Sequence, residues 1–254
     1  MVTPYDFNES VQHRAEYVEE RLRDGSPVVG MKYRDGLLLL SMKRTQRKVF
    51  EVYDRLMMSA IGNQADIEAV RIAALDFAHQ EGFSRSPDDV TVNRIVGFAL
   101  SPPLKKAFGD AWASPVVFRG VFAELAGAGS PDRFATLNYD GEFAFSEDFA
   151  VAAGSSYAEE AMVERLREAK ADVPLDEAIR AAVEAWALGH RAGSQPRALK
   201  AEDDDAGEPP VPLDEYIQTQ MKDLVVEAAV LDRQIARDAK FRLLQEVDWK
   251  DALK

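Results

Sequence analysis

The chain has 254 residues, and 46% of them are hydrophobic, which is enough for a substantial core in one large domain or two small ones. Its 44 acidic residues exceed the 31 Lys and Arg residues, and the formal net charge of −13 argues against nucleic-acid binding, which needs a basic surface. The absence of cysteine excludes disulfides, cysteine–zinc sites and thiol nucleophiles. No apolar run is long enough to span a membrane, and the first residues lack the pattern of a secretory signal, so we expect a cytoplasmic protein.

The first predicted element is a helix over residues 8–23, which Asn8 caps and Gly25-Ser26-Pro27 ends. Its apolar side chains form one narrow stripe, made of Val11, Ala15, Val18 and Leu22. Two β-prone runs, 28–33 and 37–41, flank Asp35-Gly36 and predict a hairpin. The second run contains four consecutive leucines instead of an alternating pattern, so we expect that strand to be covered on both faces.

Short strands are predicted over residues 49–62, followed by a helix that begins at Asn63 and ends at Gly82. This helix has one apolar face, formed by Ile67, Val70, Ala74 and Phe77. The sequence Ser86-Pro87-Asp88-Asp89 is typical of a helix start, and the helix is expected to run past Phe98. Pro102-Pro103 predicts a kink or a break in it.

Strands are predicted again over residues 116–125, and over 134–139 and 142–145 as a second hairpin around Asp140-Gly141. Ser156 and Glu159 form a capping-box pattern for a helix that reaches about Ala169. Pro174 opens a further helix, whose apolar residues fit the helical period.

Residues 191–222 differ in composition from the rest, because they contain an acidic run and several prolines. They are predicted to form a solvated loop or a partly disordered insertion. A last strand is expected over residues 224–231 and a charged, helical tail over 232–254.

Strand blocks that alternate with helix pairs favour an α+β fold in which two packed sheets carry helices on both outer faces. This four-layer αββα arrangement resembles the sandwich of N-terminal-nucleophile hydrolases. We expect three parts: residues 1–24 as an N-terminal segment with the outer helix, 25–232 as the sandwich domain, and 233–254 as the tail.

Five stretches of the chain resemble blocks of proteasome subunits, and among these the α-type subunits of bacterial proteasomes. The stretches are Ser26–Leu39, Arg47–Gly62, Phe134–Gly141, Val151–Ser156 and Val226–Asp232. Their order and spacing carry the resemblance, which covers roughly residues 5–190 and 224–232. The loop at 191–222 and the tail depart from the family pattern.

The resemblance places Gly25-Ser26 at the site where catalytic, β-type subunits have a Gly followed by the nucleophilic Thr, whose freed α-amine acts as the base. Lys48 falls at the position of the family's Lys, but Met42 falls at that of its Asp, and a thioether cannot stabilise a charge. Pro27 replaces a small hydroxyl residue, and a helix is predicted before Ser26. We therefore predict a non-catalytic subunit of a threonine-type endopeptidase complex. The alternative is a serine-type active subunit that uses Ser26 and Lys48.

In α-type subunits, the resemblance implies, the first helix lies across the ring and the residues before it gate the axial pore. Tyr5-Asp6 is similar to the Tyr-Asp pair of many α-type gates, with a frayed terminus as the alternative. Lys48 would lie between neighbouring subunits and receive the C-terminal carboxylate of an activator whose tail ends in a hydrophobic residue, a Tyr and a last residue. The alternative is a solvated lysine at a strand end.

Neither a metal nor a cofactor is expected. His13, His79 and His190 lack metal-binding spacing, and His79, near an apolar helix face, is predicted to be structural. Ser155 and Ser156 follow Gly154 without a G-x-S-x-G motif, and we interpret Ser156 as a helix cap. The run Asp203–Asp205 is expected to be solvated.

The predicted function is that of a non-catalytic α-type subunit of a bacterial proteasome core particle. The resemblance implies a homo-oligomeric ring of seven subunits that stacks on proteolytic β-type subunits. This ring would gate substrate entry and dock a regulatory ATPase or an ATP-independent activator, with no nucleic acid and no membrane as partners. Two alternatives are a self-compartmentalising, proteasome-related peptidase with Ser26 as N-terminal nucleophile, and a scaffold ring without a proteolytic partner.

Overall fold

The computed structural model describes residues 4–110, 112–127, 131–170, 172–194 and 211–253, with side chains from residue 8 on except that of residue 251. These residues form two five-stranded antiparallel sheets that pack face to face. The first sheet contains, in spatial order, β10 (Phe241–Leu243), β9 (Val225–Asp232), β2 (Gly36–Lys43), β1 (Val28–Tyr33) and β8 (Phe149–Ala152).

The predicted hairpin is confirmed, because β1 and β2 pair with Tyr33 opposite Gly36. The four leucines are buried on both faces of β2, as expected for a strand in the middle of a sandwich. Leu38 and Leu40 pack toward the helices, whereas Leu37 and Leu39 pack between the sheets.

The second sheet contains, in spatial order, β3 (Val49–Tyr53), β4 (Leu56–Gly62), β5 (Phe118–Glu124), β6 (Arg133–Asn138) and β7 (Phe143–Ser146). The hairpin of β6 and β7 is also confirmed, with Leu137 opposite Phe143. Gly141 in its turn has a φ of 82°, which a residue without a Cβ adopts at little cost.

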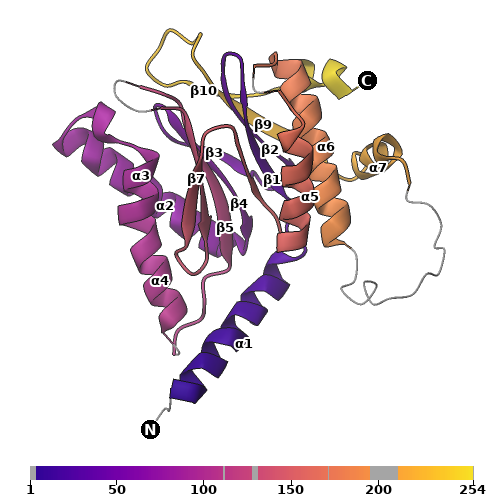
Figure 1. The fold of residues 1–254 in the computed structure, drawn as a ribbon. Coiled ribbons are helices and arrows are strands. Elements are labelled where there is room, and N and C mark those ends of the chain that lie inside the picture. The colour runs from indigo at the N-terminus through magenta and orange to yellow at the C-terminus, as the bar shows by residue number, and fades with distance from the viewer. Residues whose placement is uncertain (1–3, 111, 128–130, 171, 195–210, 254) are drawn as a thin grey trace.

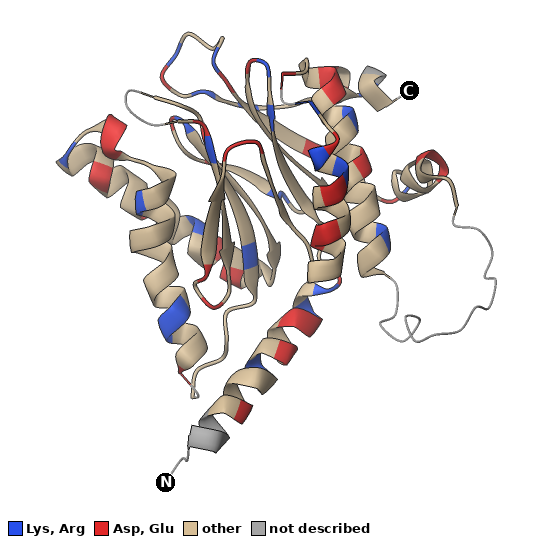
Figure 2. Ribbon diagram, viewed as in Figure 1, with Lys and Arg blue, Asp and Glu red and all other residues tan. Residues whose placement is uncertain are grey.

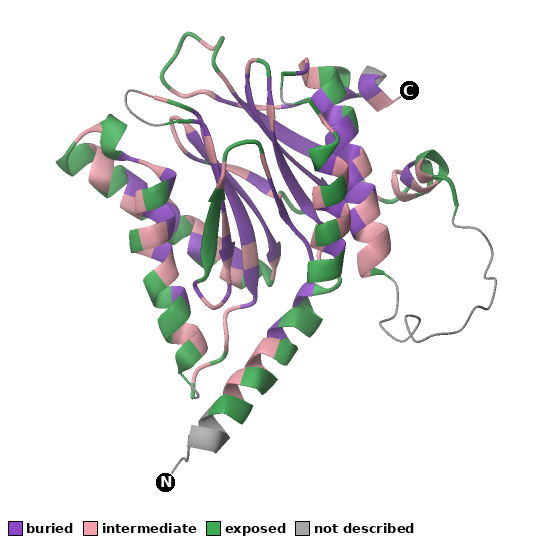
Figure 3. Cartoon of the chain, viewed as in Figure 1, coloured by how far each residue is buried: buried purple, intermediate pink, exposed green. Residues whose placement is uncertain are grey.

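Helices cover both outer faces of the two sheets (Figure 1). The helical elements are α1 (Pro4–Leu22), α2 (Gln64–Ser84), η1 (Pro87–Asp89), α3 (Val92–Arg94), η2 (Ile95–Leu100), α4 (Ser101–Gly109), α5 (Ser156–Arg167), α6 (Leu175–Gly193), α7 (Leu213–Gln220), α8 (Glu246–Trp249) and η4 (Asp251–Leu253). The α5–α6 pair packs on the first sheet, and α2 with η2 and α4 packs on the second. A third cluster fills the space between the sheets, as the buried strands of Figure 3 illustrate. The four-layer αββα sandwich is therefore confirmed.

The helix after Ser86 differs from the prediction. Ser86 caps only the single turn η1. The longer helical stretch begins at Val92, and Thr91 caps it, because its Oγ1 accepts the Arg94 N–H. The helical stretch continues from η2 through Pro102-Pro103 into α4 without a break. The preceding η2 is a π-helix, in which the Ser101 N–H reaches back to Val96 O.

Three helix ends were also predicted wrongly. The helix α1 begins at Pro4, so Asn8 lies inside it and does not cap it. Gly82 lies inside α2, where a Cβ would be 2.2 Å from the Tyr53 hydroxyl oxygen, so close packing explains this glycine better than a helix end does. Ser155, rather than Ser156, caps α5, because its Oγ accepts the Ala158 N–H at 3.2 Å. Glu159 accepts the Ala153 N–H instead of completing a capping box.

The C-terminal part contains more regular structure than its composition predicts. The helix α6 extends to Gly193, and α7 occupies residues 213–220 of the expected loop, with Ile217 buried. Asp203–Asp205 lie outside the described residues. The expected helical tail is wrong over residues 241–243, where β10 pairs with β9 and covers an edge that would otherwise be open. Among the described helices, none is both long and apolar enough to cross a membrane.

Candidate functional site

The hydroxyl of Ser26, which the sequence resemblance predicts at the nucleophile position, is held by two hydrogen bonds just before β1. Its Oγ donates to the carbonyl oxygen of Met42 at 2.7 Å and accepts the indole N–H of Trp186 at 3.0 Å. The side chain of Met42 is fully buried in the core beneath α6. The Ser26 hydroxyl is therefore engaged by both the Met42 carbonyl oxygen and the Trp186 indole.

The helix α1 closes the end of the sandwich beside Ser26. Val18 and Leu22, on its last turns, are fully buried in the core between the sheets. Gly154 lies so close to this helix end that a Cβ would be 2.6 Å from both the Arg23 Cα and the Leu22 carbonyl oxygen. The same oxygen accepts the Gly25 N–H at 2.9 Å, so the chain turns directly from α1 into Ser26.

Lys48 lies just before β3 at the same end of the sandwich. Its Nζ donates to the carbonyl oxygen of Ser26 at 3.1 Å, and its backbone N–H donates to Glu227 Oε2 at 2.7 Å. Burial lowers the pKa of Lys48 to about 8, while the carboxylate of Glu227 opposes this shift. An ammonium has three donors, so Lys48 keeps capacity for an incoming carboxylate.

Glu227, on β9, is a buried carboxylate that organises this corner. Only 3% of its side chain is exposed, and its Oε1 lies 3.3 Å from Lys43 Nζ and 3.9 Å from Arg47 Nε. A buried carboxylate needs such partners because desolvation destabilises its charge. Sequence reasoning missed this residue, although a single charge within an apolar strand was a usable signal.

A sequence model of the family described as "Proteasome subunit" matches residues 22–193, which is more than half of the chain. The chain belongs to the proteasome subunit family. Several similar proteins bear the name proteasome subunit alpha. One from a Nocardioides species is 28% identical over 96% of this chain and 85% of its own length. Those of Kineococcus radiotolerans and Rhodococcus erythropolis are 30% and 31% identical, over 78% and 74% of this chain and 85% and 75% of their own lengths.

The α-type character that the sequence blocks indicated is thus confirmed, and the chain is a proteasome subunit of the α type. The match begins at Leu22, the last residue of α1, and ends at Gly193, the last residue of α6. It therefore spans both sheets except for β9 and β10, and it includes Ser26, Lys48 and Trp186.

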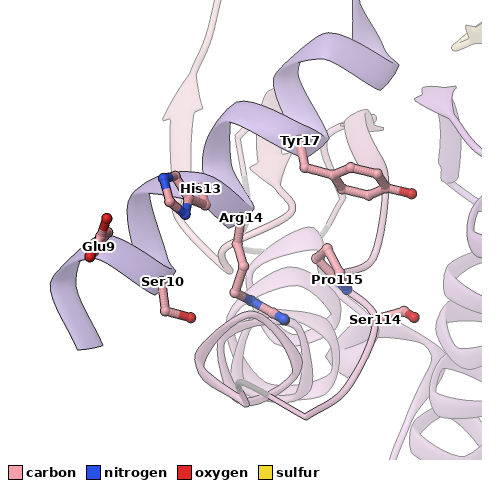
Figure 4. A pocket seen from close by; sticks show the side chains of 7 residues that line it. All are labelled: Glu9, Ser10, His13, Arg14, Tyr17, Ser114 and Pro115. Atoms are coloured by element: carbon pink, nitrogen blue, oxygen red, sulfur yellow. The ribbon is translucent and has the colours of Figure 1, made fainter. Parts of the chain in front are cut away.

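One side chain of this proteasome subunit fixes the orientation of α1. Arg14 donates its Nε–H and Nη2–H to the carbonyl oxygens of Phe108 and Ala107, both at 2.9 Å, and its Nη1–H to Ala113 O at 2.7 Å. Ala107 and Phe108 lie in the last turn of α4, where unpaired carbonyls attract a cation. Arg14 also lines a cleft of about 480 Å³ between α1 and Ser114-Pro115 (Figure 4).

Arg14→Ala is expected to release the start of α1 and to lower the free energy of unfolding by about 2 kcal/mol, because three charge-assisted hydrogen bonds are lost. Hydrogen exchange measured by mass spectrometry should show faster exchange in α1. Arg21→Ala is the matched control, since Arg21 is exposed on the same helix. Equal exchange in both variants would contradict the role of Arg14.

The remaining predicted site residues do not converge on one place. His13 lines the cleft of Figure 4, whereas His79 is exposed on α2 and packs edge-on against Tyr53, so it does not face the core. His190 stacks on Trp186 and contacts the Tyr216 hydroxyl through Nδ1. In the described part of the chain, no group of three or more His, Asp or Glu residues could hold a metal ion. The side chains of Tyr5 and Asp6 lie outside the described residues.

Proposed function

We propose that this chain is a non-catalytic α-type subunit that forms the outer, gating ring of a bacterial proteasome core particle and docks activators. The observation that carries the proposal is the closed end of the sandwich. There α1 packs beside Ser26, and the Ser26 hydroxyl donates to Met42 O. A catalytic subunit of this fold instead needs an accessible hydroxyl beside its own free α-amine.

Gating follows from the position of α1 in a ring. Its last turns are anchored in the core, and Arg14 holds its middle against α4. The first turn of α1 and the residues before it, with Tyr5-Asp6 as the proposed gate contact, would therefore leave each subunit from a fixed point. Seven such segments around one axis would form a narrow pore that excludes folded proteins by size.

Activator docking is proposed at Lys48. A lysine close to the surface, with one donor bound to Ser26 O, can accept the terminal carboxylate of a tail that wedges between neighbouring subunits. Because Ser26 adjoins the C-terminal end of α1, a shift of Lys48 toward that carboxylate would be transmitted to the helix whose N-terminal end carries the proposed gate.

The test is co-expression of this chain with a β-type subunit that carries a Gly-Thr processing site. We expect stacked rings in negative-stain images, peptidase activity that requires the β-type subunit, and no loss of that activity in Ser26→Ala. Intact-mass spectrometry should show that Ser26 remains joined to Gly25. Peptidase activity of this chain alone, lost in Ser26→Ala, would instead establish the serine peptidase.

A further inference from the structure

The last residue of β2 and the loop that joins β2 to β3 reverse the charge of the chain around them. Four of these six residues are cationic, Lys43, Arg44, Arg47 and Lys48, although the whole chain has a net charge of −13. We call these residues, 43–48, the basic loop. Figure 2 shows that acidic residues lie along α1, α5 and α7 instead.

Internal ion pairs neutralise the basic loop only in part. Among the described residues, Glu227 is the carboxylate that lies within 4 Å of these cations, paired with Lys43 and Arg47. Glu51, on β3, acts on Arg47 at longer range. These four cations, of which Lys48 is one, face two carboxylates, so the basic loop keeps an excess of positive charge.

Two arginines of the basic loop can donate outward. Arg47 is preorganised, because its Nε–H donates to Val49 O at 2.9 Å and its guanidinium lies 5.7 Å from the centre of the Phe50 ring. No hydrogen bond engages its terminal nitrogens within the part of the chain that the structure describes. Arg44 is exposed, and it too forms no hydrogen bond or ion pair there.

We propose that the basic loop recognises a short acidic segment next to the C-terminal carboxylate of a protein partner, with Arg44 and Arg47 as the specificity-determining residues. This rests on the proposed docking of tails at Lys48. Paired guanidinium donors suit carboxylates. A peptide with two or three carboxylates matches the small charge excess, whereas a nucleic acid would extend over the acidic remainder of the surface and be repelled.

The experiment measures fluorescence anisotropy of labelled ten-residue peptides on the assembled ring of the full chain. All peptides end in Leu-Tyr-Leu. One has Asp-Glu-Asp before this end and one has Asn-Gln-Asn, and each is made with a free or an amidated carboxyl end. At low salt the acidic peptide should bind about tenfold more tightly than the neutral one, and added salt should remove that preference.

The variant Arg44→Ala/Arg47→Ala should lose this preference. The control variant Arg167→Ala/Lys170→Ala should keep it, because it removes two exposed cations at the end of α5, away from the basic loop. Equal binding of acidic and neutral peptides, or a preference that survives in the Arg44/Arg47 variant, overturns the inference. Displacement of the peptide by an equal concentration of a single-stranded oligonucleotide overturns it as well, in favour of a general polyanion site.

The comparison of free and amidated carboxyl ends tests docking at Lys48 separately from the acidic preference of the basic loop. If the neutral peptide with a free carboxyl end binds, and Lys48→Ala abolishes its binding, docking stands even when the acidic preference is absent. If amidation changes the binding of neither peptide, docking at Lys48 fails. In that case, the acidic preference of the amidated peptides still decides the role of the basic loop.

Discussion

Lys48→Ala is expected to weaken the binding of a tail peptide with a free carboxyl end by at least about 30-fold, because truncating one partner of a desolvated charge pair costs about 2–5 kcal/mol. Ring assembly should be unchanged, since Lys48 donates its side chain to a single backbone carbonyl, that of Ser26. Glu227 keeps Lys43 and Arg47 as partners in the variant. Peptide anisotropy and negative-stain images measure the two effects.

The pH dependence gives a second readout for the same lysine. Burial lowers the pKa of Lys48 to about 8, so the ammonium is present below that pH and is lost as the pH rises through it. Tail affinity should therefore fall above pH 8 in the natural chain and stay flat in Lys48→Ala. Lys170→Ala, on the exposed surface, is the control and should behave like the natural chain. Tail binding that Lys48→Ala leaves intact would refute the assignment.

Trp186→Ala should lower the free energy of unfolding by about 3–5 kcal/mol, a large part of the roughly 5–15 kcal/mol that holds a domain folded. Trp186 is fully buried in α6, stacks on His190 with ring centroids 4.7 Å apart, and donates its N–H to Ser26 Oγ. Truncation therefore leaves a cavity and an acceptor without its donor. Urea unfolding followed by circular dichroism measures the loss.

Two variants separate packing from the hydrogen bond. Trp186→Phe keeps most of the ring volume but removes the donor, so we expect a smaller loss of about 1–2 kcal/mol. Trp112→Ala is the matched control for loss of an indole, because Trp112 is 96% exposed and its removal should leave the urea midpoint unchanged. A loss below about 1 kcal/mol in Trp186→Ala would contradict the packing argument.

Local sequence patterns were sufficient to predict most helices and strands of the sandwich. Both Asp-Gly sequences mark hairpins, but for different reasons: Gly141 adopts a positive φ of 82°, whereas Gly36 lies in β2, where a Cβ would collide with the Leu231 carbonyl oxygen. Four consecutive leucines indicated a strand between two layers. The same approach failed where a local signal competed with packing. Ser86 has the features of a helix cap, yet the chain forms one turn there, and Thr91 begins the helix that packs on the second sheet.

The sequence by itself determined the family and the four layers, because these depend on residue identity and short-range period. The tertiary structure decided which groups meet at the site. Trp186 reaches Ser26 across 160 residues, Glu227 reaches Lys48 across 179, and Arg14 reaches Ala113 across 99. Each of these contacts joins separate elements through one hydrogen bond. A single long-range hydrogen bond produces no periodic pattern in the sequence, so it could not be predicted from it. Only the packing of α1, of α6 and of the segment after α4 against the sheets brings those groups together.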